Sequence, residues 1–323
     1  MSETDSLDAN SITIVMYHYV RPIKGSRYPS IKGLELDSFK RQLDYLEQNF
    51  NLIKADTLIE HVKGKPALPA NACLLTFDDG YKDHYLHVLP ELKRRGLYGS
   101  FFPPVKPVKD GKVLDVNKIH FILSEQPDIK ILINDLRTML SKSQCNFDSN
   151  TDELKSFEFY WDEYAKPSRF DSKEIIFFKR MLQHILPDDV RSNICNILFQ
   201  RYVCDDQSDF ASQLYMSVDE VKELVHSGMY VGSHGYQHIW LNKETRDNQF
   251  VEIDSSLKFL ADIGAPTKDW VMCYPYGGYN ADTLDILSAR SCCLGLTTKA
   301  GLAELRSDAL LELPRFDTNE FPQ

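Results

Sequence analysis

Short apolar runs alternate with amphipathic stretches along most of the chain. Residues 12–17 and 73–77 are continuous apolar and β-branched runs, which is the pattern of strands buried on both faces. Between such runs, apolar side chains recur at helical spacing, as Phe39, Leu43 and Leu46 do within the predicted helix 38–49. Strands that alternate with helices favour a parallel sheet, so the pattern predicts an α/β fold.

The remaining elements are predicted from the same periodicity and from Gly, Pro and capping residues at their ends. Further strands are expected at 52–53, 98–102, 229–231, 271–274 and 293–297. Further helices are expected at 56–64, 82–95, 218–225, 243–263 and 282–290. A loop is expected at 21–33, because this stretch holds two prolines and two glycines.

The strand-helix rhythm breaks between residues 103 and 216. This stretch contains amphipathic helical segments, such as 129–140 and 174–185, and no clear strand pattern. It also holds a group of aromatic residues around Trp161, namely Phe157, Phe159, Tyr160 and Tyr164. We expect this group to form a local core, or alternatively a lid or sugar-stacking surface over a functional site.

Two adjacent carboxylates, Asp78 and Asp79, follow the apolar run 73–77 and precede Gly80. Asp-Gly is a turn signal, so both acids are expected where the strand leaves the sheet. The carboxyl ends of parallel strands are where ligands bind in α/β folds. Because adjacent carboxylates repel each other unless a positive charge is near, a solvated turn and a cation site both remain open.

Two histidines that are four residues apart could complete a cation site. His234 and His238 share one face if their segment makes a helical turn, which is how a zinc pair is often presented. His234 also begins just past the predicted strand 229–231. One carboxylate and two imidazoles leave an open position for water, which is the arrangement of a catalytic metal.

These residues resemble the polysaccharide deacetylases of the NodB-homology type, carbohydrate esterase family 4. The family's first motif, T-F-D-D-G, is present at 76–80. Its second, H-[S/T]-x-x-H, is matched at His234 and His238, with Gly235 in place of the usual hydroxyl residue. Its third, R-x-P-[Y/F], is only partly matched, because Cys273 stands where the arginine is expected.

The resemblance implies a distorted (β/α) barrel with a mainly helical insertion. In the family the first two motifs lie much closer together, so the stretch 103–216 would be the insertion. The parts 1–102 and 217–323 would then be the N-terminal and C-terminal parts of the barrel.

The resemblance also implies a role for each motif residue. Asp79, His234 and His238 would hold a divalent metal, with Zn²⁺ expected first and Co²⁺, Ni²⁺ or Mn²⁺ as alternatives. Asp78 would be the general base that accepts a proton from water. The backbone N–H of Tyr276 would help to hold the oxyanion.

Two family residues are missing, and substitutes are expected for both. Residues 296–298 stand where a late L-x-x-H motif would supply a histidine acid. His18, at the end of the first predicted strand, is the expected replacement, with a buried core histidine as the alternative. One family branch, acting on exported poly-N-acetylglucosamine, is similar in carrying such an early Tyr-His. Arg315 is expected to replace the missing arginine in space, although a structural salt bridge is equally compatible with the sequence.

Composition narrows the class of protein. The net charge of −10 over 323 residues argues against nucleic acid or an anionic membrane as the main partner. No apolar run approaches the roughly 18 residues of a membrane helix, and the polar N-terminus lacks the features of a signal peptide. Seven cysteines, an odd number without a C-x-x-C pair, do not suggest a disulfide framework. We therefore expect a cytoplasmic protein without a transmembrane segment.

These features together predict a metal-dependent amide hydrolase that removes an N-acyl group, first of all acetyl, from an amino sugar. The expected substrate is a sugar nucleotide or lipid-linked glycan used to make cell-surface polysaccharide or lipopolysaccharide. Three alternatives stay open: an N-deformylase of an N-formyl amino sugar, a hydrolase of a non-sugar C–N bond, and an inactive carbohydrate-binding homologue.

Overall fold

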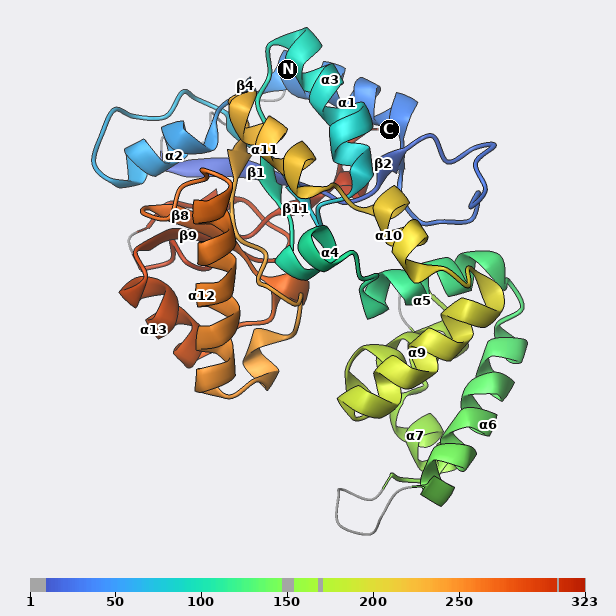
Figure 1. The fold of residues 1–323 in the computed structure, drawn as a ribbon. Coiled ribbons are helices and arrows are strands. Elements are labelled where there is room, and N and C mark those ends of the chain that lie inside the picture. Colours follow the sequence, from blue (N-terminus) through green and yellow to red (C-terminus); the bar gives the residue numbers. More distant parts are fainter. Residues whose placement is uncertain (1–9, 147–153, 168–170, 307, 323) are drawn as a thin grey trace. The chain divides into compact units, whose positions relative to one another are not determined.

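The computed structural model describes residues 10–146, 154–167, 171–306 and 308–322 (Figure 1). These residues form two compact units. The first contains the described residues of 1–22, 33–112 and 211–323, and the second contains those of 23–32 and 113–210. The predicted division into 1–102, 103–216 and 217–323 stays a prediction.

The barrel wall of the first unit begins with parallel strands in the order β1, β5, β6 and β7. β1 and β5 pair in register from Thr13 opposite Cys73 to Tyr17 opposite Phe77. This register places His18 and Asp78 side by side at the carboxyl ends of the two strands. The four strands span Ser11–Tyr17, Ala72–Asp78, Ser100–Phe102 and Tyr230–Val231.

The wall closes through β8, β9 and β11, at Trp270–Cys273, Cys292–Leu296 and Phe316–Asp317. β8 pairs with β9, and β11 pairs with β1, both in parallel. Single bridges make the other two connections, from Ser233 to Met272 and from Leu296 to Leu313. The predicted distorted (β/α) barrel is confirmed, and its distortion lies at these two bridges.

Helices cover the barrel strands with apolar faces. Leu43 of α1, Leu92 of α3 and Leu224 of α11 belong to one buried cluster with strand residues such as Phe77. A separate cluster joins α12 and α13 to β8 and includes Trp270. These helices span Leu36–Asn49, Leu89–Arg95, Val218–His226, Arg246–Asp262 and Ala281–Ala289.

The first unit also contains shorter elements. The remaining helices are α2 and α4, at Ala55–Val62 and Val105–Asp110. The remaining strands are β2, β3, β4 and β10, at Val20–Arg21, Leu34–Glu35, Asn51–Leu52 and Ala303–Glu304. Three 3₁₀ turns lie at Leu241–Lys243, Pro275–Gly277 and Thr318–Glu320, and a π-helical turn lies at His84–Val88.

Among its described residues, the regular elements of the second unit are all helices. Its aromatic residues pack as a local core: Phe157 stacks on Trp161 at 5.9 Å between ring centres and meets Phe177 edge-on at 5.3 Å. Its helices are α5 to α9, at Asp115–Glu125, Ile129–Asn146, Phe157–Tyr164, Lys173–Arg180 and Asp188–Tyr202. α10, at Gln207–Leu214, begins in the second unit and ends in the first. A π-helical turn at Met181–Ile185 follows α8.

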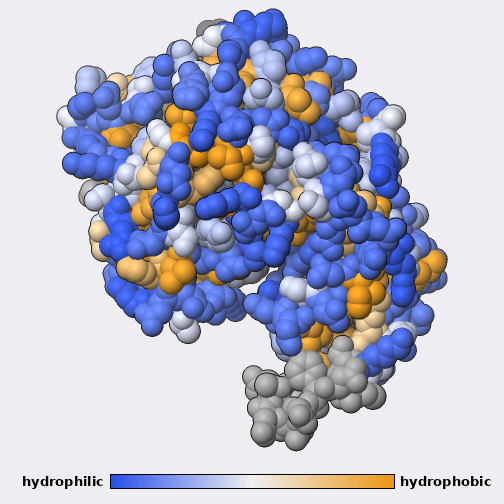
Figure 2. Space-filling view, viewed as in Figure 1, coloured by the Kyte–Doolittle hydropathy of each residue, from blue (hydrophilic) through white to orange (hydrophobic). Residues whose placement is uncertain are grey.

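One predicted helix begins later than its periodicity suggested. The stretch 243–263 becomes helical only at Arg246, because the Thr245 side chain caps the helix by accepting a bond from the Asn248 N–H. Among the described residues, no helix has the length and apolar character needed to cross a membrane. Hydrophilic residues dominate the face shown in Figure 2, consistent with the charged composition.

Candidate metal centre

The two carboxylates at the end of β5, Asp78 and Asp79, contact different partners. Asp79 takes a left-handed backbone conformation with φ +73°, which aspartate tolerates better than most residues, and its N–H donates to the Phe102 carbonyl at 3.1 Å. Gly80 follows with φ +65°, and a Cβ there would lie only 2.7 Å from the Cβ of Pro103. A glycine is therefore required for this reversal.

Asp79 meets the two predicted histidines. Its Oδ1 lies 3.3 Å from Nε2 of His234 and 3.2 Å from Nε2 of His238. All three residues are at most 7% exposed. Burial would raise the pKa of Asp79, but its contacts with the two histidines hold this pKa well below its ordinary value.

The two histidines converge through an irregular loop, so the helical-turn hypothesis is wrong. Gly235 and His238 have φ angles of +72° and +59°, which no right-handed helical turn contains. Glu252, a buried residue of α12, accepts hydrogen bonds from the N–H groups of Tyr236 and Gln237 at 3.0 and 2.8 Å. This carboxylate fixes the loop between the histidines, and spacing alone could not reveal it.

The donor set fits a divalent metal. His234 Nδ1 lies 2.7 Å from the Cys273 carbonyl, an acceptor, so Nδ1 carries the proton and Nε2 is left as a ligand atom. His238 Nδ1 is buried and has no hydrogen-bond partner among the described residues. One ligand atom from each of Asp79, His234 and His238 falls within 4.8 Å of the other two. Two imidazoles and one carboxylate are ligands of a catalytic zinc site.

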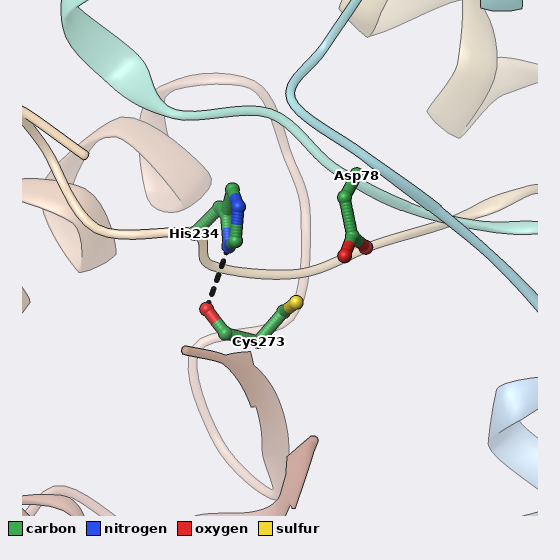
Figure 3. Close-up of side chains that lie close together, drawn as sticks. All are labelled: Asp78, His234 and Cys273. Atoms are coloured by element: carbon green, nitrogen blue, oxygen red, sulfur yellow. Dashed lines mark hydrogen bonds between the residues drawn. The ribbon is translucent and has the colours of Figure 1, made fainter. Parts of the chain in front are cut away.

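A second group, Asp78, His234 and Cys273, also brings possible ligand atoms within 4.8 Å of one another. Figure 3 shows these side chains around the hydrogen bond from His234 to the Cys273 carbonyl. Arg315 already binds both oxygens of Asp78, and burial raises the pKa of the Cys273 thiol. The Asp79 group is therefore the better candidate for a metal site.

Asp78 is held by a buried guanidinium. Arg315 donates to its two oxygens at 3.0 and 2.8 Å, and both residues are 1% exposed. Arg315 is anchored in turn by the Thr297 carbonyl at 2.8 Å and the Thr76 hydroxyl at 3.1 Å. Burial would raise the pKa of Asp78, but the charge of Arg315, with that of His234 and His18, holds it below its ordinary value.

His18 lies beside Asp78 and is open to solvent. Its Nε2 is 3.9 Å from Asp78 Oδ2, and its side chain is 40% exposed, so it is not a buried core histidine. The His18 carbonyl lies 2.8 Å from Nε2 of His84, a fully buried residue. This contact ties the backbone at His18 to the helix that follows the Asp-Asp turn.

Tyr276 lies next to a metal-ligand candidate. Its ring centre is 4.6 Å from that of His238 and 4.7 Å from that of Trp240, with the Tyr276 and Trp240 planes only 4° apart. Trp240 was not predicted as a site residue, although its place two positions after His238 offered a signal. Tyr81, also left without a role by the sequence, donates its hydroxyl to Asp79 Oδ2 at 2.7 Å.

Part of the chain matches the sequence model of a known protein family. The sequence model described as "Polysaccharide deacetylase" matches residues 200–291, which include both histidines and Tyr276. A Bacillus subtilis (strain 168) protein, YxkH, which is provisionally named a polysaccharide deacetylase, is 30% identical over 89 residues. That match covers 28% of this chain and 32% of the relative, about a third of its length.

Structure comparison extends the likeness to nearly the whole chain. A Streptococcus pyogenes deacetylase, PplD, solved in complex with acetate, aligns with a TM-score of 0.58 and 17% identity, covering 95% of this chain and 92% of that one. A de-N-acetylase from Aggregatibacter actinomycetemcomitans aligns with a TM-score of 0.51 and 15% identity, covering 95% of each chain. The sequence match over 200–291 and the shared fold confirm the predicted resemblance to the polysaccharide deacetylase family.

Proposed function

We propose that this chain is a metal-dependent hydrolase that removes the N-acetyl group from an amino sugar. One observation carries the proposal. Asp78, paired with Arg315, stands directly beside the Asp79, His234 and His238 set without belonging to it. A site that only bound a cation would not need a second carboxylate held ionised in this way.

Asp79, His234 and His238 would hold the divalent metal, with Zn²⁺ favoured over Co²⁺, Ni²⁺ and Mn²⁺. Such a metal supplies Lewis-acid activation of an acyl carbonyl and of water. Asp78 accepts the proton of the attacking water, because its low pKa keeps it ionised and Arg315 fixes its direction. The backbone N–H of Tyr276 donates to the oxyanion that develops on the acyl oxygen.

His18 gives its proton to the leaving nitrogen. An amide nitrogen must be protonated before its bond to carbon breaks, since a free amide anion is far too basic to leave. The position of His18, next to Asp78 and partly exposed, supports this role. Its exposure also lets the imidazole regain a proton from water after each turnover.

The substrate proposed is an N-acetylated amino sugar carried on a nucleotide or lipid, in the synthesis of cell-surface polysaccharide or lipopolysaccharide. The acetate bound to the Streptococcus pyogenes deacetylase supports an acetyl group. The parallel rings of Trp240 and Tyr276 support a sugar, because flat aromatic faces suit its apolar side. A cytoplasmic location, expected from the sequence, favours a precursor over a finished polymer.

Metal content and amine release test this function on the full chain. Purified protein should hold about one metal ion, and it should release free amine from N-acetyl sugar nucleotides or lipid-linked sugars in a screen. N-formyl analogues in the same screen test the deformylase alternative. Asp78→Asn is the matched control, because it keeps the shape of the site and removes the base. Metal binding without amine release from any N-acyl sugar would contradict the proposal and favour a binding homologue.

A further inference from the structure

The two oxygens of the Asp79 carboxylate have separate partners. Oδ1 faces Nε2 of both His234 and His238, at 3.3 and 3.2 Å. Oδ2 accepts the Tyr81 hydroxyl at 2.7 Å, a short hydrogen bond between buried groups. One oxygen is therefore directed into the candidate metal centre, and the other is held away from it.

Tyr81 is held in place on several sides. Its ring stacks on Tyr19 at 4.1 Å and lies nearly parallel to Tyr215 at 6.2 Å, and its side chain is 0% exposed. Its backbone forms an antiparallel bridge to Tyr215, and the Gly80 carbonyl accepts the Met216 N–H at 3.0 Å. These contacts fix the position of the hydroxyl oxygen beside Asp79.

A carboxylate can bind a metal through one oxygen or through both. Binding through both would occupy an extra coordination position, whereas catalysis needs positions left open for water and substrate. We propose that Tyr81 is a positioning residue that restricts Asp79 to a single metal-facing oxygen. This inference rests on the metal centre of the proposed function and adds a residue to it.

The test replaces one hydroxyl and leaves the ring. Tyr81→Phe removes the donor to Oδ2 and keeps the aromatic stacking, so the fold should be retained. Tyr17→Phe is the matched control, because Tyr17 is also 0% exposed and its hydroxyl has no hydrogen-bond partner among the described residues. Each protein is stripped of metal and loaded with Co²⁺, and its visible absorption, Co²⁺ affinity and kcat are measured.

Tyr81→Phe should still bind one Co²⁺ per chain, with a weaker and shifted absorption band, because coordination through both oxygens raises the coordination number. Its kcat should fall by about 10–100-fold, the usual effect of losing a partner of a metal ligand. Tyr17→Phe should match the parent in absorption, Co²⁺ affinity and kcat.

The outcomes separate the two proposals. If the parent binds Co²⁺ and Tyr81→Phe has the same spectrum and kcat, the role of Tyr81 is overturned while the proposed function stands. If Tyr81→Phe loses Co²⁺ altogether, the single-oxygen role is also overturned, since the hydroxyl would then be needed for binding itself. If the parent takes up no Co²⁺, the metal centre of the proposed function fails, and the inference fails with it.

Discussion

Two sides of the barrel are built in different ways. On the ladder side, β1, β5, β6 and β7 pair through successive residues. On the bridge side, β8, β9 and residues 313–317 connect to the ladder side by the bridge from Ser233 to Met272 and by β11. The ladder side carries the three candidate metal ligands, whereas the bridge side supplies Arg315, Tyr276 and the Cys273 carbonyl.

The comparison teaches that the candidate metal ligands and the guanidinium that holds Asp78 come from separate parts of one wall. Asp79 follows a strand with neighbours on both sides, which suits a ligand whose position must be fixed. Arg315 acts on Asp78 from the other side, through contacts that depend on the docking of residues 313–317. Substitutions on the two sides should therefore have different signatures.

The largest effect is expected from the ligands on the ladder side. Asp79→Ala, His234→Ala and His238→Ala should each lose bound metal and all measurable turnover, because each removes one of three protein ligands. Metal analysis of the purified variants checks this, with His226→Ala as the control because that histidine is exposed on α11. Full metal occupancy in His238→Ala would remove His238 from the ligand set.

Asp78→Asn should lower kcat on the order of 10²–10⁴-fold while metal content stays at the parental level, because it removes a proton acceptor and keeps the side-chain shape. Steady-state kinetics with metal analysis of the same sample measures both quantities. Activity within a few-fold of the parent would show that the roles of general base and metal ligand have been assigned to the wrong aspartates.

His18→Ala should separate two kinds of substrate. Hydrolysis of the sugar amide should fall by roughly 10²–10⁴-fold, because the amine leaving group needs a proton. Hydrolysis of an activated phenyl ester should stay near the parental rate, since a phenolate leaves without one. Both substrates are assayed with one protein sample, so protein quality cancels, and equal losses would place the acid elsewhere.

The last effect is expected on stability, from the bridge side. Arg315→Met should lower the free energy of unfolding by about 3–5 kcal/mol, because it leaves the buried Asp78 charge without its partner. The double variant Asp78→Asn/Arg315→Met should recover much of that loss, since no charge is then stranded. Denaturant unfolding of the four proteins measures this coupling, and fully additive losses would contradict a direct pair.

The sequence predicted most where the signal was local. The run 73–77, the two acids and Gly80 are contiguous, so the strand end and its turn followed from residue types alone. The beginning of α12 was missed by a few residues because Thr245 caps it, and a side-chain cap overrides periodicity.

The rest depended on backbone conformation and distant contacts. The spacing of His234 and His238 suggested both a shared site and a helical turn. The segment is instead an irregular loop, whose positive φ angles are incompatible with a helical turn. Arg315 could only be proposed beside a salt-bridge alternative, because its contact with Asp78 spans 237 positions. The direction of the Tyr81 hydroxyl depends on the reversal at Asp79, which no sequence period encodes.

The separation of Asp78 and Arg315 also has a consequence in time. A ribosome adds roughly 5–20 residues per second, so the 237 positions between them take roughly 10 to 50 s to translate. Throughout that interval the nascent chain carries the carboxylate without its guanidinium. Burying an unpaired charge is unfavourable, so this end of β5 should stay hydrated until residues 313–317 dock. The candidate site is therefore complete only after the last part of the barrel has docked.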